Sequence, residues 1–446
     1  MQRKMLEELK GWLCSTERKP LILRGARQIG KTWIVRELAK DQGMKLLEIN
    51  FERNPEVGEI FIEKNPQHII EQLEILYNMD FIPEKIILFL DEIQSNPQIL
   101  GNLRWFYEEM PSLAVIAAGS LLEFILEDHD FSMPVGRVSY MYMEPMSFIE
   151  FLWAMGEKKL AEHIENSYHT LEMPDILHRK AIELFRQYYI VGGMPAAVKS
   201  WAENRNAQEC NDIQTDLLMT YRDDFNKYRK RISAEHLRIT LSSTALQIGD
   251  RFMYSRIGAD VRQPILKESL NMLIAARLCR KIYHTAANGL PLGAEVKDTI
   301  FKVFLIDTGL VMRMLGQQPM NEVQLEKMVW ANKGALAEQM ASQLLFAGFV
   351  PRNNSIYYWQ QSGSGTGEID FLMQKDGLVC PIEVKAGASG SMKSLHAFME
   401  SKKLSKAFRL DTNKPSKMQI DVKTNAGKPV SYELISLPIY MAEFLA

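Results

Sequence analysis

Two glycines, a lysine and a threonine mark a loop at residues 25–32. The segment reads Gly25-Ala26-Arg27-Gln28-Ile29-Gly30-Lys31-Thr32, which fits the pattern GxxxxGK followed by Ser or Thr. In such a loop the backbone amides approach phosphate oxygens, the lysine pairs with the β and γ phosphates, and the threonine hydroxyl ligates Mg²⁺. The sequence therefore predicts an ATP site with these nucleotide contacts: Gly25, Gln28, Gly30, Lys31 and Thr32.

A pair of carboxylates follows an apolar segment downstream of this loop. Asp91 and Glu92 come directly after residues 86–90, which read Ile-Ile-Leu-Phe-Leu. Parallel sheets in α/β proteins place their functional residues at the carboxyl ends of the strands. We expect Asp91 to hold the Mg²⁺ shell and Glu92 to orient or polarise the attacking water, so the pair indicates ATP hydrolysis. The alternative is an acidic start to a helix.

Two further residues are candidates for the same site. Ser120 follows the apolar residues 114–118, next to the expected γ-phosphate position, and either senses that phosphate or is an ordinary turn serine. Arg137 lies in a Val-Gly-Arg-Val segment. It is a candidate arginine finger that acts in its own subunit or across a subunit interface, and the alternative is a surface ion pair.

Two apolar segments near the other end of the sequence flank the dipeptide Asp376-Gly377. Asp-Gly is a favoured two-residue hairpin turn, so residues 367–374 and 378–385 are expected to pair as antiparallel strands. Counting outward from the turn then places Asp370 opposite Glu383.

Lys385 lies two residues beyond Glu383 and therefore shares its face of the hairpin. Two carboxylates and an amine on one spot are what a magnesium-dependent phosphodiesterase needs. The carboxylates of Asp370 and Glu383 would hold a cation that activates water, and the lysine would orient the water or stabilise developing charge. The alternatives are a salt-bridged hairpin face, or a nuclease-like fold that is kept for binding.

The elements that must position the ATP site occupy residues 1–150. Short apolar runs at residues 21–23, 46–51, 86–90 and 114–118 alternate with helical stretches, the first of which runs from Lys31 to about Asp41. Continuously apolar strands separated by helices predict an α/β fold with a parallel sheet covered on both faces.

The middle of the chain has a different pattern. Residues 151–230 are predominantly helical, with one sharp break at Gly192-Gly193-Met194-Pro195. Residues 231–318 show helices followed by a hairpin, which is the order of a winged-helix-like module with residues 263–280 as its third helix.

Charge allows two roles for that module. From residue 231 to residue 313 there are twelve Lys or Arg and seven Asp or Glu. This local positive balance permits contact with DNA through phosphates, and the alternative is a unit that contacts protein or supports the lid. Residues 319–446 form the last predicted unit, with a helix at 326–345 and strands around Tyr357, Ile369 and Val384.

The composition excludes several other classes of protein. The 446 residues contain 53 Lys or Arg and 55 Asp or Glu, so the net charge of the whole chain does not indicate a nucleic-acid or membrane partner. The four cysteines fall in no CxxC pair, which favours reduced thiols in a cytoplasm. The charged N-terminal segment does not fit a signal peptide, and no run of eighteen apolar residues could span a membrane.

The motifs together resemble a known group of ATPases. The phosphate loop, the Leu-Asp-Glu segment, the Gly-Ser pair and Gly-Arg-Val followed by residues 144–151 (Glu-Pro-Met-Ser-Phe-Ile-Glu-Phe) are similar to AAA-superfamily ATPases that carry a nuclease-like C-terminal domain of unknown function. The Gly-Gly-Met-Pro segment resembles the lid-opening element of signal-transducing ATPases with numerous domains. That resemblance implies a position near the nucleotide for Pro195, and the alternative is a helix-breaking loop.

The C-terminal spacing resembles the PD-(D/E)xK nuclease superfamily. Asp370, Glu383 and Lys385 match its core motif, although Ile369 stands where the family name has proline. The resemblance implies that Glu338, on the preceding helix, is an additional metal-binding acid, and that Ser394 is a further site residue.

These observations predict four units and one main function. The units are a P-loop ATPase domain (1–150), a helical lid (151–230), a winged-helix-like domain (231–318) and a restriction-endonuclease-like domain (319–446). We expect a cytoplasmic ATPase that uses ATP and Mg²⁺ and couples hydrolysis to its C-terminal domain in DNA processing or defence. DNA is a candidate partner, and an oligomer could form through the ATPase domain. The alternatives are a regulatory switch whose C-terminal domain only binds, and a scaffold without either activity.

Overall fold

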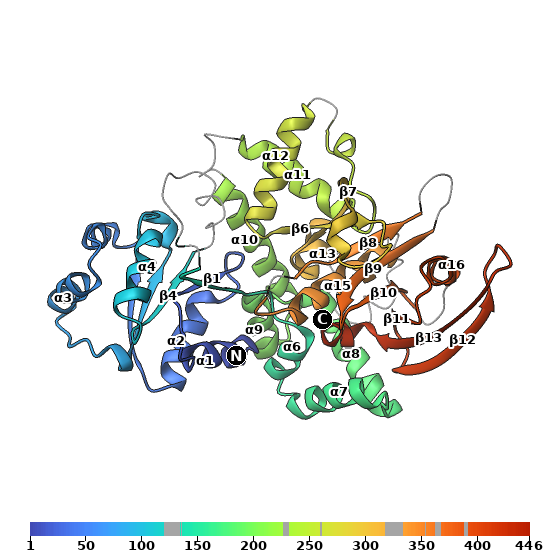
Figure 1. Cartoon of the computed structure of the whole chain (residues 1–446), viewed down its shortest axis with the longest axis horizontal. Helices are drawn as coiled ribbons and strands as arrows, with labels where there is room; N and C mark the ends of the chain where they lie inside the picture. Colours follow the sequence, from blue (N-terminus) through green and yellow to red (C-terminus); the bar gives the residue numbers. More distant parts are fainter. Residues whose placement is uncertain are drawn as a thin grey trace.

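The computed structural model describes residues 1–119, 134, 136–225, 232–258, 261–316, 333–352, 354–361, 367–387 and 391–446. Ser120 and the first part of the helix predicted at residues 326–345 lie outside the described residues. The described residues form two sheets: a parallel one in the N-terminal third of the chain, and a mixed one in its C-terminal half (Figure 1).

The first sheet has five strands in the order β2-β3-β4-β1-β5. Each neighbouring pair is parallel, which confirms the α/β prediction. The strands are β1 (Leu21–Arg24), β2 (Lys45–Asn50), β3 (Ile86–Asp91), β4 (Ala114–Ala118) and β5 (Ser139–Tyr142). Four of them follow the predicted apolar runs, whereas β5 was not predicted because its residues are half exposed.

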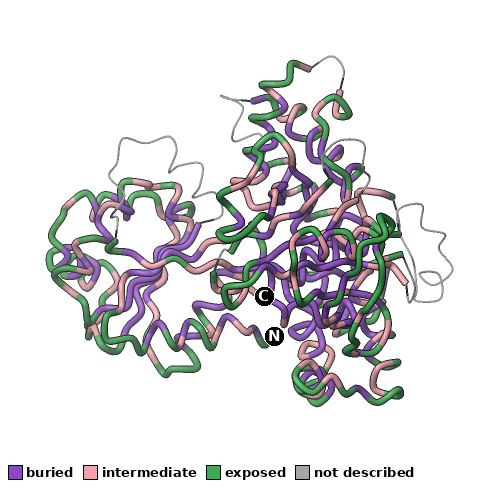
Figure 2. Tube along the Cα trace, turned by 45° about the vertical axis from the view of Figure 1, so that its right-hand side comes forward, coloured by how far each residue is buried: buried purple, intermediate pink, exposed green. Residues whose placement is uncertain are grey.

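Helices cover both faces of this sheet. They are α1 (Met5–Leu13), α2 (Lys31–Asp41), α3 (Pro66–Tyr77) and α4 (Ile99–Glu109), with 3-10 turns η1 (Pro55–Ile62), η2 (Pro83–Lys85) and η3 (Ile93–Ser95). Successive strand residues enter opposite cores: Leu21 and Leu23 pack with α1 and α2, whereas Ile22 packs with α3 and α4. The central strands β1, β3 and β4 are almost entirely buried, as the purple parts of the trace in Figure 2 show.

A run of helices follows the first sheet in the described part of residues 148–225. They are α6 (Phe148–Ala154), α7 (Lys158–Thr170), α8 (Asp175–Val191), α9 (Pro195–Asn204) and α10 (Ala207–Phe225). The first begins at a capping box, in which Ser147 and Glu150 each bond the other's backbone amide. These helices bury apolar residues in the same continuous core as α1, α2 and the second sheet, so the N-terminal unit and the C-terminal half are packed together.

The second sheet has eight strands in the order β12-β13-β11-β10-β9-β8-β6-β7. Its strands are β6 (Cys279–Thr285), β7 (Val296–Leu305), β8 (Tyr357–Gln360), β9 (Glu368–Lys375), β10 (Leu378–Val384), β11 (Lys406–Asp411), β12 (Ser416–Lys423) and β13 (Pro429–Pro438). The remaining helices are α11 (Ala234–Leu246), η5 (Tyr254–Arg256), α12 (Gln263–Ala275), η6 (Leu292–Glu295), α13 (Thr308–Met314), α15 (Lys333–Gly348), α16 (Lys393–Lys402) and η7 (Ile439–Phe444).

The predicted hairpin of the winged-helix-like module forms, but it is not a separate wing. Strands β6 and β7 pair antiparallel as expected, and β6 also pairs in parallel with β8 through Tyr283 and Tyr357. The hairpin therefore completes one edge of the C-terminal sheet. Alternation within a segment predicts a strand but not its neighbour, so the sequence could not reveal this pairing. The unit boundary at residue 319 stays a prediction, and the sheet itself crosses it.

The β9–β10 hairpin has the predicted register. Lys375 pairs with Leu378, and the ladder continues outward to Phe371 with Ile382, so the next positions are Asp370 and Glu383. Asp376 and Gly377 both have positive φ, 50° and 73°, as a two-residue type I′ turn requires.

Candidate functional site

The phosphate loop joins the end of β1 to the start of α2. Gly25 has φ +148° and Gly30 has φ +94°, and Gly30 is the residue that caps α2. A Cβ atom added at Gly25 would lie 2.7 Å from the Met143 carbonyl oxygen. Glycine is therefore required here because the backbone packs closely against the chain that follows β5.

Lys31 is buried within the loop that it follows. Its Nζ donates hydrogen bonds to the carbonyl oxygens of Gly25, at 2.9 Å, and Ala26, at 2.8 Å. The ammonium is thus held at the mouth of the loop, at the N-terminus of α2, where the helix dipole favours an anion. This is the position from which it can pair with a phosphate oxygen.

Thr32 and Asp91 meet although they are 59 residues apart in the sequence. The Thr32 hydroxyl donates to Asp91 Oδ2 at 3.0 Å, and Asn50 Nδ2 lies 3.5 Å from the same oxygen. Burial, and next the charge of Glu92, raise the pKa of Asp91. A hydroxyl beside a desolvated carboxylate fits the oxygen set that Mg²⁺ prefers, so these two residues could hold the ion of a Mg-nucleotide.

Glu92 turns out of β3 with a left-handed backbone, φ 51°. Its carboxylate accepts a hydrogen bond from the Gln94 side chain. Sequence reasoning missed Gln94 and also Asn50. The signal for Asn50 was available, since it is the last residue of β2 and is the register partner of Asp91 in the neighbouring strand.

The helical region contacts the phosphate loop from α10. Arg27 forms an ion pair with Asp224, and the Tyr221 hydroxyl donates to the Arg27 carbonyl oxygen at 3.0 Å. Two residues near the C-terminal end of one helix therefore bind both the side chain and the backbone of the loop. A shift of α10 would therefore change the position of the phosphate loop.

Arg137 lies at the amino-terminal end of the strands, whereas the phosphate loop lies at their carboxyl end. It precedes β5, whose first residue, Ser139, pairs with Leu21 at the start of β1, whereas the loop follows the end of β1. Its Nε contacts Glu108 Oε1 at 3.0 Å in a half-exposed ion pair. A finger role on the nucleotide of its own chain does not fit this position. A role across a subunit interface stays a prediction, and so does the sensor role of Ser120.

The Gly-Gly-Met-Pro segment packs against the end of β7. The Gly193 amide donates to Asp307 Oδ2 at 2.6 Å, and the Gly193 carbonyl accepts from the Met146 amide at 2.7 Å. Gly192 has φ +70°, and a Cβ atom there would overlap the Asp307 carboxylate. Pro195 then begins α9. The glycines are needed for this close approach, and a nucleotide contact for Pro195 stays a prediction.

The buried Asp307 carboxylate predicts a pH dependence of stability. Burial raises the pKa of Asp307 to about 6, although it accepts bonds from Gly193, Leu310 and Gln343. Because the folded chain holds this proton more tightly than the unfolded chain, the contribution is present below about pH 4 and is lost as the pH rises through about 6. The wild type should lose up to about 3 kcal/mol of unfolding free energy over that window from this group.

Urea unfolding at pH 4, 5, 6 and 7 would measure it. Asp307→Asn should remove that part of the slope, because an amide does not titrate, whereas the exposed Asp216→Asn should keep it. Parallel curves for Asp307→Asn and the wild type would contradict the assignment.

The candidate nuclease-like residues come together as their register predicts. Asp370 Oδ2 accepts from the Val384 amide at 2.7 Å, and Glu383 Oε1 contacts Lys385 Nζ at 2.5 Å. Glu383 is buried, and no hydrogen-bond partner reaches its Oε2 from the described part of the chain. Burial, and next the charge of Asp370, raise the pKa of Glu383 to about 8. An orphaned carboxylate oxygen beside a second carboxylate fits a divalent cation.

Glu338 lies near Asp370, but it pairs with Lys302, which the sequence did not suggest. Its oxygen, with those of Glu368 and Asp370, lies in a group within 4.8 Å. The fully buried Lys302, from β7, contacts Glu338 at 2.8 Å and forms an ion pair with Glu368. Burial alone would lower the pKa of Lys302, but the Glu338 and Glu368 carboxylates raise it. A lysine ammonium therefore neutralises the half of the cluster where the additional metal-binding acid was predicted.

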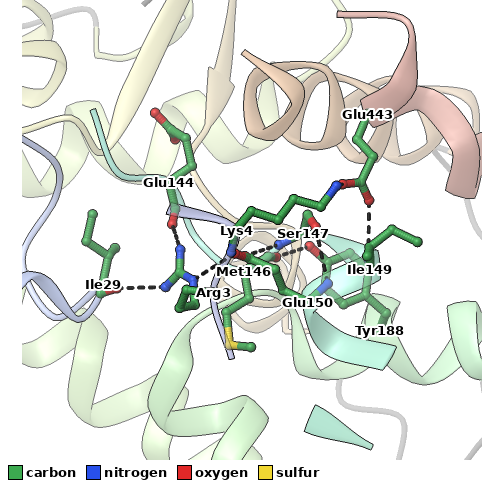
Figure 3. A network of polar contacts seen from close by, with 10 residues as sticks. All are labelled: Arg3, Lys4, Ile29, Glu144, Met146, Ser147, Ile149, Glu150, Tyr188 and Glu443. Carbon is green, nitrogen blue, oxygen red and sulfur yellow. Dashed lines mark hydrogen bonds and ion pairs between the residues drawn. The ribbon is translucent and has the colours of Figure 1, made fainter. Parts of the chain in front are cut away.

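A network at the N-terminus connects the phosphate loop to the helical region (Figure 3). Arg3 Nη1 donates to the Ile29 carbonyl at 3.0 Å, Nη2 donates to the Glu144 carbonyl at 2.6 Å, and Nε contacts Glu150 at 3.1 Å. Arg3 is buried, so these bonds are shielded from water. One guanidinium thus ties the loop to the cap of α6.

The same network reaches the end of the C-terminal half. Lys4 donates its amide to Glu150 at 2.7 Å and its Nζ to Glu443 at 2.7 Å, and Glu443 also accepts from the Ile149 amide (Figure 3). Glu443 belongs to η7, which follows the last strand of the second sheet. The phosphate loop and the C-terminal half are therefore joined through Arg3, Lys4 and Glu150.

Family models match three parts of the chain. Residues 17–152 match an AAA domain, residues 182–321 a domain of unknown function (DUF8612), and residues 333–431 another domain of unknown function (DUF4143). No curated protein matches the chain. The N-terminal unit is an AAA-type P-loop domain, as its loop and the Thr32–Asp91 pair indicate. The two other models leave the nuclease-like assignment as a prediction.

Comparison with solved structures finds similarity at low identity and low TM-score. The Walker-type ATPase PABY2304 of Pyrococcus abyssi is 16% identical, with a TM-score of 0.44 over 71% of this chain and 95% of that one. The ORC2 protein of Aeropyrum pernix is 12% identical, with a TM-score of 0.35 over 72% and 91%. The Holliday junction branch migration motor RuvB of Thermotoga maritima is 14% identical, with a TM-score of 0.30 over 63% and 89%.

Among the described residues, no helix combines the length and the apolar character that crossing a bilayer requires.

Proposed function

We propose that this chain hydrolyses ATP and couples the hydrolysis to a nuclease-like C-terminal half that acts on DNA. The observation that carries the first part is the meeting of Thr32 and Asp91 beside Lys31. Lys31 would bind the β and γ phosphates, Thr32 and Asp91 would hold Mg²⁺, and Glu92 would orient the attacking water. Arg137 would act only across a subunit interface, in an oligomer formed through the AAA domain.

The second part rests on Asp370, Glu383 and Lys385. When bound, a divalent cation would activate water there for attack on a phosphodiester. The carboxylates of Asp370 and Glu383 would hold it, and Lys385 would release Glu383 to bind a phosphate oxygen or orient the water. Glu338 keeps Lys302 in place instead of binding the cation.

Contacts between the phosphate loop and the C-terminal half support the proposed coupling. Arg3 contacts a carbonyl of the phosphate loop, and the adjacent Lys4 contacts Glu443 after the last strand. The α10 residues Tyr221 and Asp224 bind the loop from the other side. A change in loop conformation on hydrolysis would therefore act on both the helical region and the C-terminal half.

The alternative is an ATP-dependent switch whose C-terminal half only binds, and one observation favours it. Lys302 pairs with Glu338 and Glu368, two of the three acids in the cluster, so fewer carboxylates are available to a cation.

ATP turnover tests the proposal. Steady-state hydrolysis with Mg²⁺ is measured without DNA and with single-stranded, duplex and branched DNA, beside cleavage of the same DNA. Stimulation of turnover by DNA together with cleavage supports the proposal. An ATP hydrolysis rate that none of these DNAs changes, together with no cleavage, would establish the switch instead.

A further inference from the structure

A cleft of about 850 Å³ opens between the AAA domain and the start of the second sheet. One wall comes from the ends of β1 and β5, at Arg24 and Tyr142, and the other from α12 and β6. The volume is near the upper end of pockets that hold small ligands. Arg24 immediately precedes Gly25, so the cleft adjoins the phosphate loop without containing it.

Positive charge exceeds negative charge at the base of this cleft. Arg277 Nη2 contacts Glu144 Oε1 at 3.3 Å, and Arg280 forms an ion pair with the other oxygen of the same carboxylate. Burial lowers the pKa of Arg280 to about 9, which still leaves it charged at neutral pH. Two guanidinium groups therefore share the Glu144 carboxylate in a poorly solvated place.

Lys281 adds a further cation. Its Nζ donates to the neutral amide oxygen of Asn271 at 2.8 Å. Glu268 and Asp298 also line the cleft, so the basic side chains, four with Arg24, outnumber the acidic ones. An anion that enters would find an excess of donors.

The backbone of Arg277 indicates that its side chain is needed. It has φ +58° directly after the C-cap of α12, a position where glycine is favoured. Arginine there costs about 1 kcal/mol relative to glycine. The guanidinium lies 4.6 Å from the centre of the Tyr142 ring and reaches Glu144.

Aromatic side chains line the cleft next to these cations. Tyr283 and Tyr357 are register partners on the parallel neighbours β6 and β8, so they stand side by side on one face. Tyr142 belongs to the other wall. Cations interleaved with flat rings are the chemistry that binds phosphates and stacks unpaired bases.

We propose that this cleft binds a single-stranded segment of nucleic acid. Arg277, Arg280 and Lys281 contact its phosphates, and its bases stack on Tyr283 and Tyr357. A duplex cannot offer its base faces in this way. The proposal rests on the proposed function only in taking DNA as the substrate, and it names the part of the chain that receives the strand.

The position of Glu144 gives this cleft a route to the phosphate loop. Its carboxylate holds the cleft arginines, and its carbonyl accepts from Arg3, which also contacts Ile29 of the loop. A phosphate that draws Arg277 from Glu144 would therefore act on the residue that bridges to the nucleotide.

Fluorescence anisotropy of the full chain tests the proposal, with labelled oligo-dT and a matched duplex in EDTA and without nucleotide. We expect the chain to prefer the single strand. Lys281→Gln and the double variant Tyr283→Leu/Tyr357→Leu should each weaken it about tenfold or more. Arg277→Gln should reduce the salt dependence by about 0.7 per lost phosphate contact. Arg238→Ala, an exposed charge on α11 outside the cleft, should bind like the wild type.

Thermal unfolding of each variant separates lost binding from lost folding. Single-strand binding that the folded cleft variants leave intact, or a preference for duplex, would overturn the proposal. So would displacement of the oligonucleotide by AMP at micromolar concentration, which would identify a mononucleotide pocket. Because the assay contains neither ATP nor a divalent cation, these outcomes do not depend on either catalytic activity.

Discussion

Replacing Lys31 with alanine is expected to lower ATP turnover at least about 100-fold. The variant loses the Lys31 ammonium at the phosphate loop, which would stabilise charge on the transferring phosphoryl group. Binding of ATP should weaken as well, because the same group pairs with the β and γ phosphates. Release of inorganic phosphate measures the turnover, and titration with a fluorescent ATP analogue measures the binding.

Lys40→Ala is the matched control for this result. Lys40 is an exposed lysine in the last turn of the same helix, α2, so the variant loses an equal charge without touching the loop. It should keep wild-type turnover. Equal turnover by Lys31→Ala and Lys40→Ala would show that the loop is not the site of hydrolysis. Thermal unfolding of both variants checks that the loss of two loop hydrogen bonds has not unfolded the domain.

Replacing Asp370 with asparagine is expected to lower cation-dependent DNA cleavage at least about 100-fold, because the variant loses one of the two carboxylates available to the cation. Glu338→Gln should keep most of the activity. Its oxygen pairs with Lys302, and an amide oxygen at the same place can still accept from that ammonium.

Binding of Mn²⁺ separates ligand from neighbour without using activity. The ion should raise the unfolding temperature of the wild type and of Glu338→Gln, and should leave that of Asp370→Asn unchanged. Loss of the shift in Glu338→Gln would restore Glu338 as a ligand. A wild type that shows neither a Mn²⁺ shift nor cleavage would favour the switch over the nuclease.

Short-range patterns made much of this molecule predictable from the sequence. The loop at residues 25–32 and the pair Asp91-Glu92 are local signals, and parallel strands bring their ends to one edge of the sheet. The hairpin register followed from the turn chemistry of Asp376-Gly377 alone. In both cases the geometry depends on neighbours in the chain, so spacing is sufficient.

Long-range partners were not predictable in the same way. Lys302 is a lysine among the apolar residues at the end of β7, and nothing nearby in the sequence indicates that the fold buries it against Glu338 and Glu368. Arg137 is the opposite case. Its segment fits a phosphate contact, but the pairing of β5 with β1 places it at the end of the strands away from the phosphate loop. Which strand lies beside which is decided by the packing of the whole chain.

The pairing of β6 with β8 limits how this protein can be divided. A fragment that begins at α15 would lack Lys302, remove the ammonium that pairs with the partly buried Glu338 and Glu368, and expose the edge of β8 to other chains. The regions matched by the two models of unknown function share this single sheet. The second sheet extends from residue 279 to residue 438. A recombination event that kept this sheet intact would have to exchange that whole segment, so we expect the two regions to be inherited together.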